Sequence, residues 1–316
     1  MSQPVAGCYF FKTKKNKYSL KGDYFMTNTT PVALITGASS GMGAAATREF
    51  LKAGYTVYAG ARRVDKMAPL ADLGAHLISL DVTDPASNQR AVDQILAEVG
   101  RIDVLLNNAG YGSFGALEDV SPEEAKRQFD VNVFGAMNLT QLVIPTMRAQ
   151  HTGRIINNSS TGGQLYSPLG GWYYASKHAL EALSDSLRLE LKPFGIDVII
   201  VEPGGTDTNW QQITNEHLLA STPQDSPYRA MAEQVTQTTI NGLSTAEDLG
   251  RLMLKAATSR HPKIRYQAKF IDKVMVVAAR KLSYRTLDWI VGASQRLLTK
   301  APRHTDSTMT ATSRQN

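Results

Sequence analysis

Cysteine is almost absent from this chain of 316 residues, since Cys8 is the only one. A single cysteine cannot form an internal disulfide, and no group of Cys and His residues has metal-ligand spacing. We therefore expect a protein of a reducing compartment, the cytoplasm, with no metal. The apolar runs are too short to cross a bilayer. The first 30 residues also do not combine a basic segment with an apolar segment and a small-residue cleavage site, as a signal peptide does.

A strong excess of positive charge is missing from the body of the chain. The net charge of +6 comes from the ends: residues 1–30 carry five basic residues against one acidic, and residues 259–316 carry twelve against three. Nucleic-acid binders need basic residues along a folded face, so no nucleic-acid partner is expected. The lysine-rich residues 1–30 are predicted to be a disordered extension, with a start at Met26 as an alternative that would leave residues 1–25 outside the native protein. Residues 301–316 are predicted to be a disordered tail.

Predicted strands and helices alternate from Pro31 onward, which is typical of a parallel sheet covered by helices on both faces. The pattern predicts a single α/β domain over residues 31–267, with a doubly wound sheet of the Rossmann type. The expected strands include residues 32–36, 56–60, 76–80, 102–106, 196–201 and 264–267. The expected helices include residues 44–53, 85–99, 121–150, 172–191 and 245–257.

A glycine-rich turn follows the first predicted strand and precedes a helix. Its glycines would let the backbone approach a pyrophosphate, and a helix N-terminus favours an anion. The candidate contacts in this turn are Gly37, Ser39, Ser40, Gly41, Met42 and Gly43. Candidates at the ends of later strands are Asp81, Val82, Asn108, Ala109, Gly110, Pro203, Gly204, Thr206 and Thr208. Asn107 either faces the same crevice or ties neighbouring strands together.

The residues after the second strand indicate which dinucleotide binds. A site for NAD needs an acidic residue there to accept from the ribose hydroxyls, whereas arginine suits the 2′-phosphate of NADP. Arg62 and Arg63 occupy this position, and no acid occurs before Asp65. The sequence therefore favours NADP(H), although the two arginines could merely end a surface turn.

A hydroxyl, a phenol and an ammonium occur together between Ser160 and Lys177. Tyr173 and Lys177 are four apart in a predicted helix and share one face, while Tyr174 is a rival within reach of the same lysine. A phenol that exchanges protons near neutrality needs its pKa lowered by about 3, and a neighbouring ammonium would favour the phenolate. Ser160 could then bind the substrate oxygen. A Tyr and a Lys at this spacing also occur together by chance, so the surrounding motifs must decide whether the pair is catalytic.

Three further features have less specific signals. Asn132 interrupts the apolar pattern of its helix, and is either a structural polar link or part of a proton relay. Residues 209–241 are polar with weak periodicity and are a candidate lid over the substrate. Residues 268–300 form a basic, amphipathic helical extension, for which packing over the pocket mouth is favoured over contact with a membrane or partner.

These motifs, taken together in order, resemble those of the short-chain dehydrogenase/reductase family over residues 31–267. The turn pattern T-G-x-x-x-G-x-G begins at Thr36, N-N-A-G spans residues 107–110, and P-G-x-x-x-T begins at Pro203. The family's catalytic residues fall on Asn132, Ser160, Tyr173 and Lys177. Asn158 is a departure, because the family usually has an apolar residue there. We expect it to loosen strand packing without touching the chemistry.

The resemblance implies an NADP(H)-dependent oxidoreductase that interconverts a hydroxyl and a carbonyl. Tyr173 would be the general acid or base, Lys177 would lower its pKa and hold the nicotinamide ribose, and Ser160 would polarise the carbonyl. Asn132 would hold a water that connects Lys177 to solvent. Residues 107–117 and 176–190 are similar to the branch that acts on steroids, retinoids and other apolar small molecules. A homodimer or homotetramer is implied. The competing hypothesis is an NADP-binding sensor or scaffold without turnover.

Overall fold

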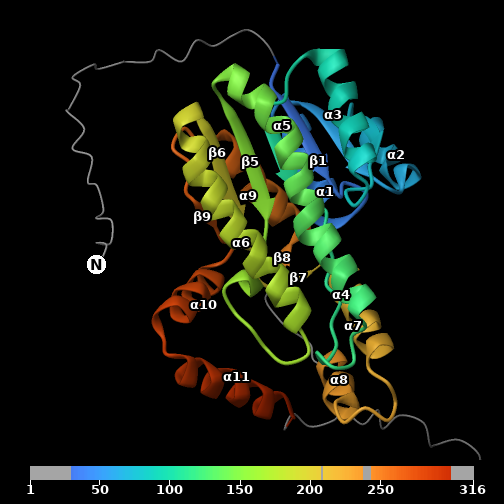
Figure 1. Cartoon of the computed structure of the whole chain (residues 1–316), viewed down its shortest axis with the longest axis vertical. Coiled ribbons are helices and arrows are strands. Elements are labelled where there is room, and N and C mark those ends of the chain that lie inside the picture. The colour runs from blue at the N-terminus through green and yellow to red at the C-terminus, as the bar shows by residue number, and fades with distance from the viewer. Residues whose placement is uncertain (1–29, 208, 238–242, 300–316) are drawn as a thin grey trace, which may run out of the picture.

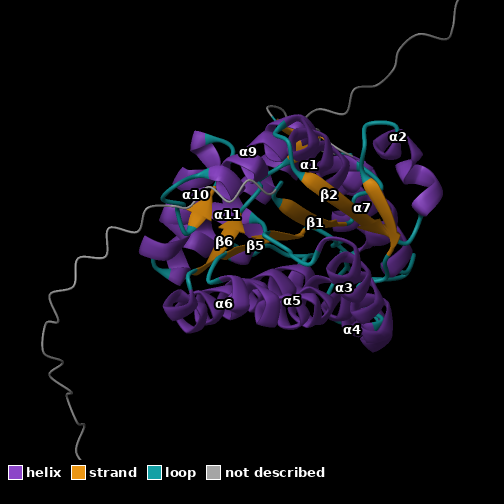
Figure 2. Ribbon diagram, turned by 90° about the horizontal axis from the view of Figure 1, so that it is seen from above, coloured by secondary structure: helices purple, strands orange, loops and turns teal. Residues whose placement is uncertain are grey.

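The computed structural model describes residues 30–207, 209–237 and 243–299. The two segments predicted to be disordered, apart from Thr30, lie outside the described residues. The described chain forms a layered α/β structure in which helices enclose a central sheet (Figures 1 and 2).

The central sheet has seven parallel strands in the order β3-β2-β1-β4-β5-β6-β9. Their bounds are β1 (Val32–Thr36), β2 (Thr56–Ala61), β3 (His76–Ser79), β4 (Val104–Asn107), β5 (Gly153–Asn158), β6 (Ile196–Val201) and β9 (Arg265–Tyr266). The strand order reverses between β1 and β4, so their carboxyl ends form the crevice in which ligands bind to such sheets. This arrangement confirms the predicted Rossmann-type doubly wound sheet.

Helices cover both faces of the sheet (Figure 2). One layer consists of α3 (Pro85–Val99), α4 (Pro122–Phe129), α5 (Ala136–Gln150) and α6 (Gly171–Leu191). The other face carries α1 (Gly41–Lys52) and α9 (Ala246–Thr258), while the short η1 (Val64–Met67) and α2 (Ala68–Ala71) connect β2 to β3. Because both faces are buried, β1 is apolar throughout: Ala33 and Ile35 face α1 and α9, and Val32 and Leu34 face the other layer.

A π-helical segment, η2 (Asp130–Gly135), interrupts the helix predicted over residues 121–150. It carries Asn132 and brings the chain so close to the loop after β3 that a Cβ on Gly135 would lie 2.6 Å from the Val82 carbonyl oxygen. Single π-turns of this kind frequently occur at functional sites, because they re-aim side chains within an otherwise regular helix.

The candidate lid is more regular than its sequence pattern indicates. It contains α7 (Asn209–Ser221) and α8 (Arg229–Thr236), and residues 238–242 lie outside the described part. A two-stranded sheet, β7 (Thr206–Asp207) with β8 (Ser244–Thr245), joins its two ends. Leu218 and Ala232 pack with Ala116 and Leu169 in a small separate core. That this segment opens and closes over a substrate remains a prediction.

The remaining short elements flank the site and the C-terminus. They are η3 (Thr161–Gly163), η4 (Lys192–Phe194), α10 (Phe270–Lys281) and α11 (Tyr284–Thr299). The last two extend below the main body in Figure 1, where α11 lies beside the lid helix α8.

The close packing of α9 on α1 gives a stability test. A Cβ on Gly250 would lie 2.8 Å from the carbonyl carbon of Ala45, in the backbone of α1. Gly250→Ala would stabilise an isolated helix by about 1 kcal/mol. Here it should lower the free energy of unfolding by about 1–3 kcal/mol, because the two backbones must separate. Denaturant unfolding measures the change, with the exposed neighbour Arg251→Ala as control; a stabilised Gly250→Ala protein would contradict this packing.

Candidate active site

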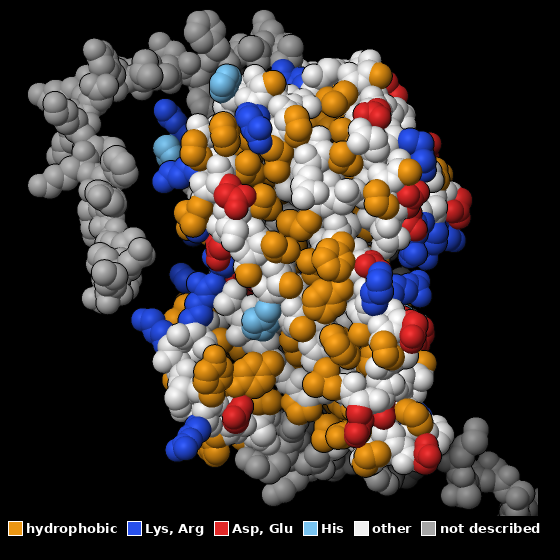
Figure 3. All heavy atoms as spheres, in the orientation of Figure 1, with side chains coloured by type: hydrophobic (Ala, Val, Ile, Leu, Met, Phe, Trp, Pro, Cys, Tyr) orange, Lys and Arg blue, Asp and Glu red, His pale blue; other side chains and the backbone are white. Residues whose placement is uncertain are grey.

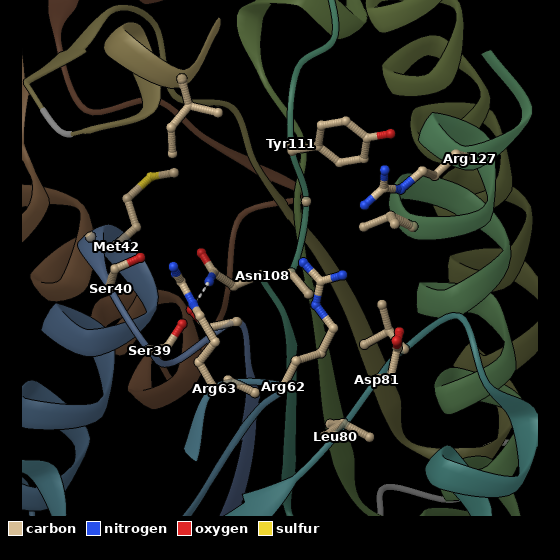
Figure 4. A pocket seen from close by; sticks show the side chains of 18 of the residues that line it. Ser39, Ser40, Met42, Arg62, Arg63, Leu80, Asp81, Asn108, Tyr111 and Arg127 are labelled. Carbon is tan, nitrogen blue, oxygen red and sulfur yellow. Dashed lines mark hydrogen bonds between the residues drawn. The ribbon is translucent and has the colours of Figure 1, made fainter. Parts of the chain in front are cut away.

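A cleft of about 360 Å³ opens at the carboxyl ends of β1, β2, β3 and β4 (Figure 4). Twelve of the predicted cofactor contacts line it: Gly37, Ser39, Ser40, Gly41, Met42, Arg62, Arg63, Asp81, Val82, Asn108, Ala109 and Gly110. The sequence did not identify the other seven lining residues, which are Ala61, Leu80, Tyr111, Arg127, Val131, Ile213 and His217. His217 and Ile213 come from α7, so the lid segment forms part of the cleft wall.

The glycine-rich turn requires its glycines for two different reasons. Gly37 and Gly41 have φ values of +67° and 52°, in the left-handed region that side chains disfavour. Gly43 instead faces a neighbouring backbone, since a Cβ there would lie 2.3 Å from the Gly37 carbonyl oxygen. The first turn of α1 holds no acidic residue, and the Ser40 side chain forms no capping bond. The N-terminus of α1 is therefore suited to an anion.

Three arginines contribute side chains to the same cleft. Figure 4 shows Arg62 and Arg63 after β2 and Arg127 on α4, all directed toward its interior. None of them forms an ion pair with any described residue. Arg127 lies 5.9 Å from the ring centroid of Tyr111, whose hydroxyl donates to Glu124 Oε1 at 3.0 Å. The cleft therefore carries positive charge that is not neutralised by direct ion pairs within the described chain.

Asp81 is the acidic residue on the cleft wall. Burial alone would raise the pKa of its carboxyl, but hydrogen bonds from Thr83 and the charges of Arg62 and Arg127 bring the pKa below its ordinary value. Asp81 therefore stays ionised and also holds the turn after β3, since its Oδ1 accepts from the Thr83 amide at 3.0 Å and hydroxyl at 2.8 Å.

The four predicted catalytic residues meet beyond the Gly110 end of this cleft. Tyr173 is 7% exposed, and a hydrogen bond joins its phenol to Ser160. Ser160 itself donates to the Pro203 carbonyl at 3.3 Å and accepts from the Gly162 amide at 3.0 Å. Tyr174 instead forms a 2.8 Å hydrogen bond with the Ser167 hydroxyl. The geometry therefore separates the two tyrosines, which spacing alone left open.

The predicted direction of the Tyr173 pKa shift is wrong. Burial raises the pKa of Tyr173 above its ordinary value, and the Ser160 hydrogen bond opposes this only in part. Lys177 Nζ lies 6.0 Å from the Tyr173 ring centroid and donates to the Asn158 carbonyl at 2.8 Å. Its own pKa falls to about 8, because burial disfavours the ammonium more than the charge of Glu181 favours it.

Asn132 makes three hydrogen bonds in its π-helical segment. Its Nδ2 donates to the Tyr111 carbonyl at 2.9 Å and to Ser176 Oγ at 3.1 Å, and its Oδ1 accepts from the Tyr111 amide at 3.0 Å. It is thus a structural link between η2 and α6. A Cβ on Gly110 would lie 3.1 Å from Asn132 Oδ1 and 3.7 Å from Lys177 Nζ, so both groups border the same small space. The proton-relay role stays a prediction.

Asn158 is integrated into the site, contrary to expectation. Its Nδ2 donates to Asn108 Oδ1 at 3.0 Å and lies 3.8 Å from the sulfur of Met42. Asn108 Nδ2 in turn donates to the Thr36 carbonyl at 2.9 Å, and the Asn158 carbonyl accepts from Lys177. Asn158 therefore connects the glycine-rich turn to the lysine. Asn107 has the structural role, since its Nδ2 donates to Asn157 Oδ1 at 2.9 Å and to Thr140.

The candidates after β6 lie outside the cleft lining. Pro203 supplies the carbonyl that binds Ser160, and Thr206 is buried in β7. Gly204 packs against Asp272 of α10, because a Cβ there would lie 2.1 Å from Asp272 Oδ1. Thr208 lies outside the described residues. That these residues bind a cofactor remains a prediction.

Comparisons with known proteins agree with this architecture. The sequence model of the protein family described as short chain dehydrogenase matches residues 31–219 of this chain. The chain is 41% identical over 198 residues to the 3-ketodihydrosphingosine reductase of Bacteroides thetaiotaomicron, a match that covers 62% of this chain and 71% of that protein. A short-chain dehydrogenase structure from Streptomyces avermitilis superposes with a TM-score of 0.72 at 31% identity, covering 85% of this chain and 99% of the other.

Related structures carry two different dinucleotides. A short-chain dehydrogenase/reductase from Burkholderia phymatum in complex with NAD has a TM-score of 0.68 at 27% identity, covering 83% of this chain and 95% of that one. A metagenomic short-chain oxidoreductase in complex with NADP has a TM-score of 0.60 at 26% identity, covering 75% and 96%. Cofactor choice must therefore be argued from this chain's own residues.

The buried ammonium of Lys177 gives a prediction about stability. Its pKa falls from 10.5 to about 8, which corresponds to a cost of roughly 3 kcal/mol at pH 7. Lys177→Met should therefore raise the free energy of unfolding at pH 7 by about 1–3 kcal/mol. Between the two pKa values the unfolded chain binds more protons, so wild-type stability rises with pH and the gain should shrink.

Denaturant unfolding at neutral pH and near pH 9.5 tests this expectation. Lys255→Met removes an exposed lysine from α9 and should leave stability nearly unchanged at both values. If Lys177→Met were destabilised at neutral pH, the burial of an ammonium would not be the dominant cost at this position.

Proposed function

The chain belongs to the short-chain dehydrogenase/reductase family, and on this premise we propose that it is an NADP(H)-dependent oxidoreductase that interconverts a hydroxyl and a carbonyl. The observation that carries the proposal is the hydrogen-bonded pair of Tyr173 and Ser160 next to a buried Lys177. This group lies beyond Gly110, at one end of a cleft that has a glycine-rich turn and three arginines. Such an arrangement can hold a dinucleotide and a carbonyl oxygen side by side.

Tyr173, Ser160 and Lys177 would each have a separate role in the reaction. A bound NADP(H) would supply the hydride exchange with the substrate carbon. The Tyr173 phenol gives its proton to the carbonyl oxygen as the alcohol forms, and Ser160 donates a hydrogen bond to the same oxygen. Lys177 holds the ribose hydroxyls and favours the phenolate that remains. In the oxidation each proton moves in the opposite direction.

The raised pKa of Tyr173 suits the proton-donor role that reduction requires near neutrality. A buried phenol that stays protonated is ready to act as the acid. Oxidation needs the phenolate, which burial disfavours. We therefore expect the ratio of oxidation to reduction rates to increase as the pH rises.

The three arginines of the cleft support NADP(H) over NAD(H). The 2′-phosphate of NADP(H) carries nearly two negative charges and several acceptor oxygens. These features suit guanidinium groups that have no ion-pair partners. Arg127 adds to Arg62 and Arg63 from a different helix, so the charge is concentrated at the end of the cleft near Asp81.

Cofactor preference can be inverted at Arg62. Arg62→Asp should weaken NADPH binding by about 10- to 100-fold, the loss of one charge-assisted contact. NADH binding should become tighter, because the new carboxylate can accept from the ribose hydroxyls. Fluorescence titration with both cofactors measures the two constants, and Lys66→Asp, an exposed change a few residues away, is the control. An unchanged preference would contradict this use of Arg62.

An apolar alcohol, ketone or aldehyde is the proposed substrate. The small core under α7 and α8 is apolar, and Phe114 lies 5.3 Å from the Tyr173 ring, centroid to centroid. The similarity to a 3-ketodihydrosphingosine reductase supports a long-chain or comparably apolar compound, as does the resemblance to the steroid and retinoid branch. We also propose a homodimer or homotetramer through the α4 to α6 layer, where Phe134 and Leu189 are exposed.

Tyr173→Phe separates an enzyme from a silent NADP-binding sensor. The variant should lose turnover by at least about 100-fold, because the proton donor is absent, while its NADPH affinity stays within a few-fold of wild type. NADPH oxidation is followed with a panel of carbonyl compounds from small aldehydes to steroid-sized ketones, with Tyr174→Phe as the matched control. Turnover that survives in Tyr173→Phe and falls in Tyr174→Phe would reassign the acid. NADPH binding without turnover of any panel member would favour the sensor.

A further inference from the structure

The two C-terminal helices expose an unusual set of large hydrophobic side chains. Phe270 is 81% exposed, Ile271 57% and Trp289 67%. The others are Val274, Met275, Val277, Leu282, Tyr284 and Ile290. We refer to these nine residues as the C-terminal apolar surface. Isolated exposed hydrophobics are normal, but nine on two consecutive helices and the turn between them indicate a surface that contacts something else.

The attachment of these helices does not require the apolar surface. In α10 the buried side chains are Asp272 and Val276, and the Asp272 carboxylate binds the Gly204 and Lys269 amides. In α11 the contacts to the body include the buried Leu287 and a 2.9 Å hydrogen bond from the Tyr166 hydroxyl to Asp288. The side chains that hold the helices in place are thus distinct from those that are exposed.

The exposed apolar residues of α10 lie on one face. At 100° per residue, the sector that contains its exposed apolar side chains and Leu282 spans about 160°. An ordinary surface helix has polar residues on its outward face, whereas the described residues in this sector are apolar except for Lys281. The arrangement is that of an amphipathic helix whose apolar face has no covering among the described residues.

Basic residues accompany this surface. Lys273, Lys281 and Arg285 are exposed and form no ion pair with a described residue. The two acidic residues of the same stretch, Asp272 and Asp288, are already engaged by the protein. Figure 3 shows basic side chains next to hydrophobic ones at the lower left, over α10 and α11. The surface therefore combines apolar area with positive charge.

We propose that the C-terminal apolar surface docks onto an anionic phospholipid bilayer, with α10 and α11 lying in the interface. Apolar side chains with flanking Lys and Arg are the features that bind helices to such surfaces, and an exposed Trp is suited to the headgroup region. None of the described helices is long and apolar enough to span a membrane. A symmetric contact with a second copy is disfavoured, because it would bring the same basic residues against each other.

Docking would place the bilayer beside the candidate active site. Asp272 of α10 contacts Gly204, and the adjacent Pro203 binds Ser160. Because Asp272 lies on the buried face of α10, this helix would then separate the bilayer from the Gly204 contact. The docking itself does not depend on the proposed reaction and can be tested without it.

Vesicle sedimentation of the full chain tests the proposal. Binding should occur to phosphatidylcholine vesicles that contain phosphatidylglycerol and be at least about 10-fold weaker to phosphatidylcholine alone. The triple variant Phe270→Ser, Ile271→Ser, Trp289→Ser and the triple variant Lys273→Glu, Lys281→Glu, Arg285→Glu should each weaken binding at least about 10-fold. Circular dichroism and thermal unfolding check that both variants remain folded.

Matched controls alter exposed apolar and basic residues elsewhere on the protein. One control is Leu73→Ser, Val99→Ser, Ile264→Ser, and the other is Lys66→Glu, Lys192→Glu, Lys255→Glu; both should bind as the wild type does. Vesicle binding that survives in both test variants would overturn the proposal and assign the affinity to the basic termini.

Fluorescence quenching distinguishes lipid contact from self-association. Brominated phospholipids should quench the wild-type tryptophan emission, and Trp289→Phe should lose most of this quenching. An absence of quenching would overturn the proposal. So would concentration-dependent self-association that the apolar triple variant abolishes without any vesicle binding, because a second copy would then cover this surface.

Discussion

Hydrogen bonds between side-chain amides at the ends of β4 and β5 hold the site together. Asn107 binds Asn157, and Asn108 binds Asn158 one position further along the paired strands. Asn108 also fixes the backbone of the glycine-rich turn, while the Asn158 carbonyl fixes Lys177. One short ladder thus links the cleft to Tyr173, Ser160 and Lys177, the candidate catalytic group, and this ladder depends on the parallel register of the two strands.

Buried polar groups around this ladder act against stability. Lys177 and Tyr173 are both buried, and burial displaces their pKa values in opposite directions. A second buried cluster lies behind them, where Arg265 of β9 pairs with Glu181 and Glu202, and burial raises the pKa of Glu202 to about 7. Such networks are costly unless every member is satisfied.

Much of the fold and part of the site could be predicted from local patterns. The strands β1 and β6 and the helix α3 match their predicted bounds, because apolar runs and the proline and glycine at the ends of α3 are local signals. The glycine-rich turn was readable for the same reason. The sequence did not identify Arg127 as a cleft residue. Nothing close to it in the sequence distinguishes an arginine that faces a cleft from one on the solvent-exposed face of an amphipathic helix.

The sequence by itself determined the order of strands and helices, the glycines of the turn and the spacing of Tyr173 and Lys177, since each depends on residues close together in the chain. The tertiary structure decided what depends on distant residues. It turned Tyr174 toward Ser167, linked Asn158 to both Asn108 and Lys177, and raised the pKa of Tyr173 through burial. It also left one face of α10 exposed, because burial depends on which other parts of the chain pack against a helix.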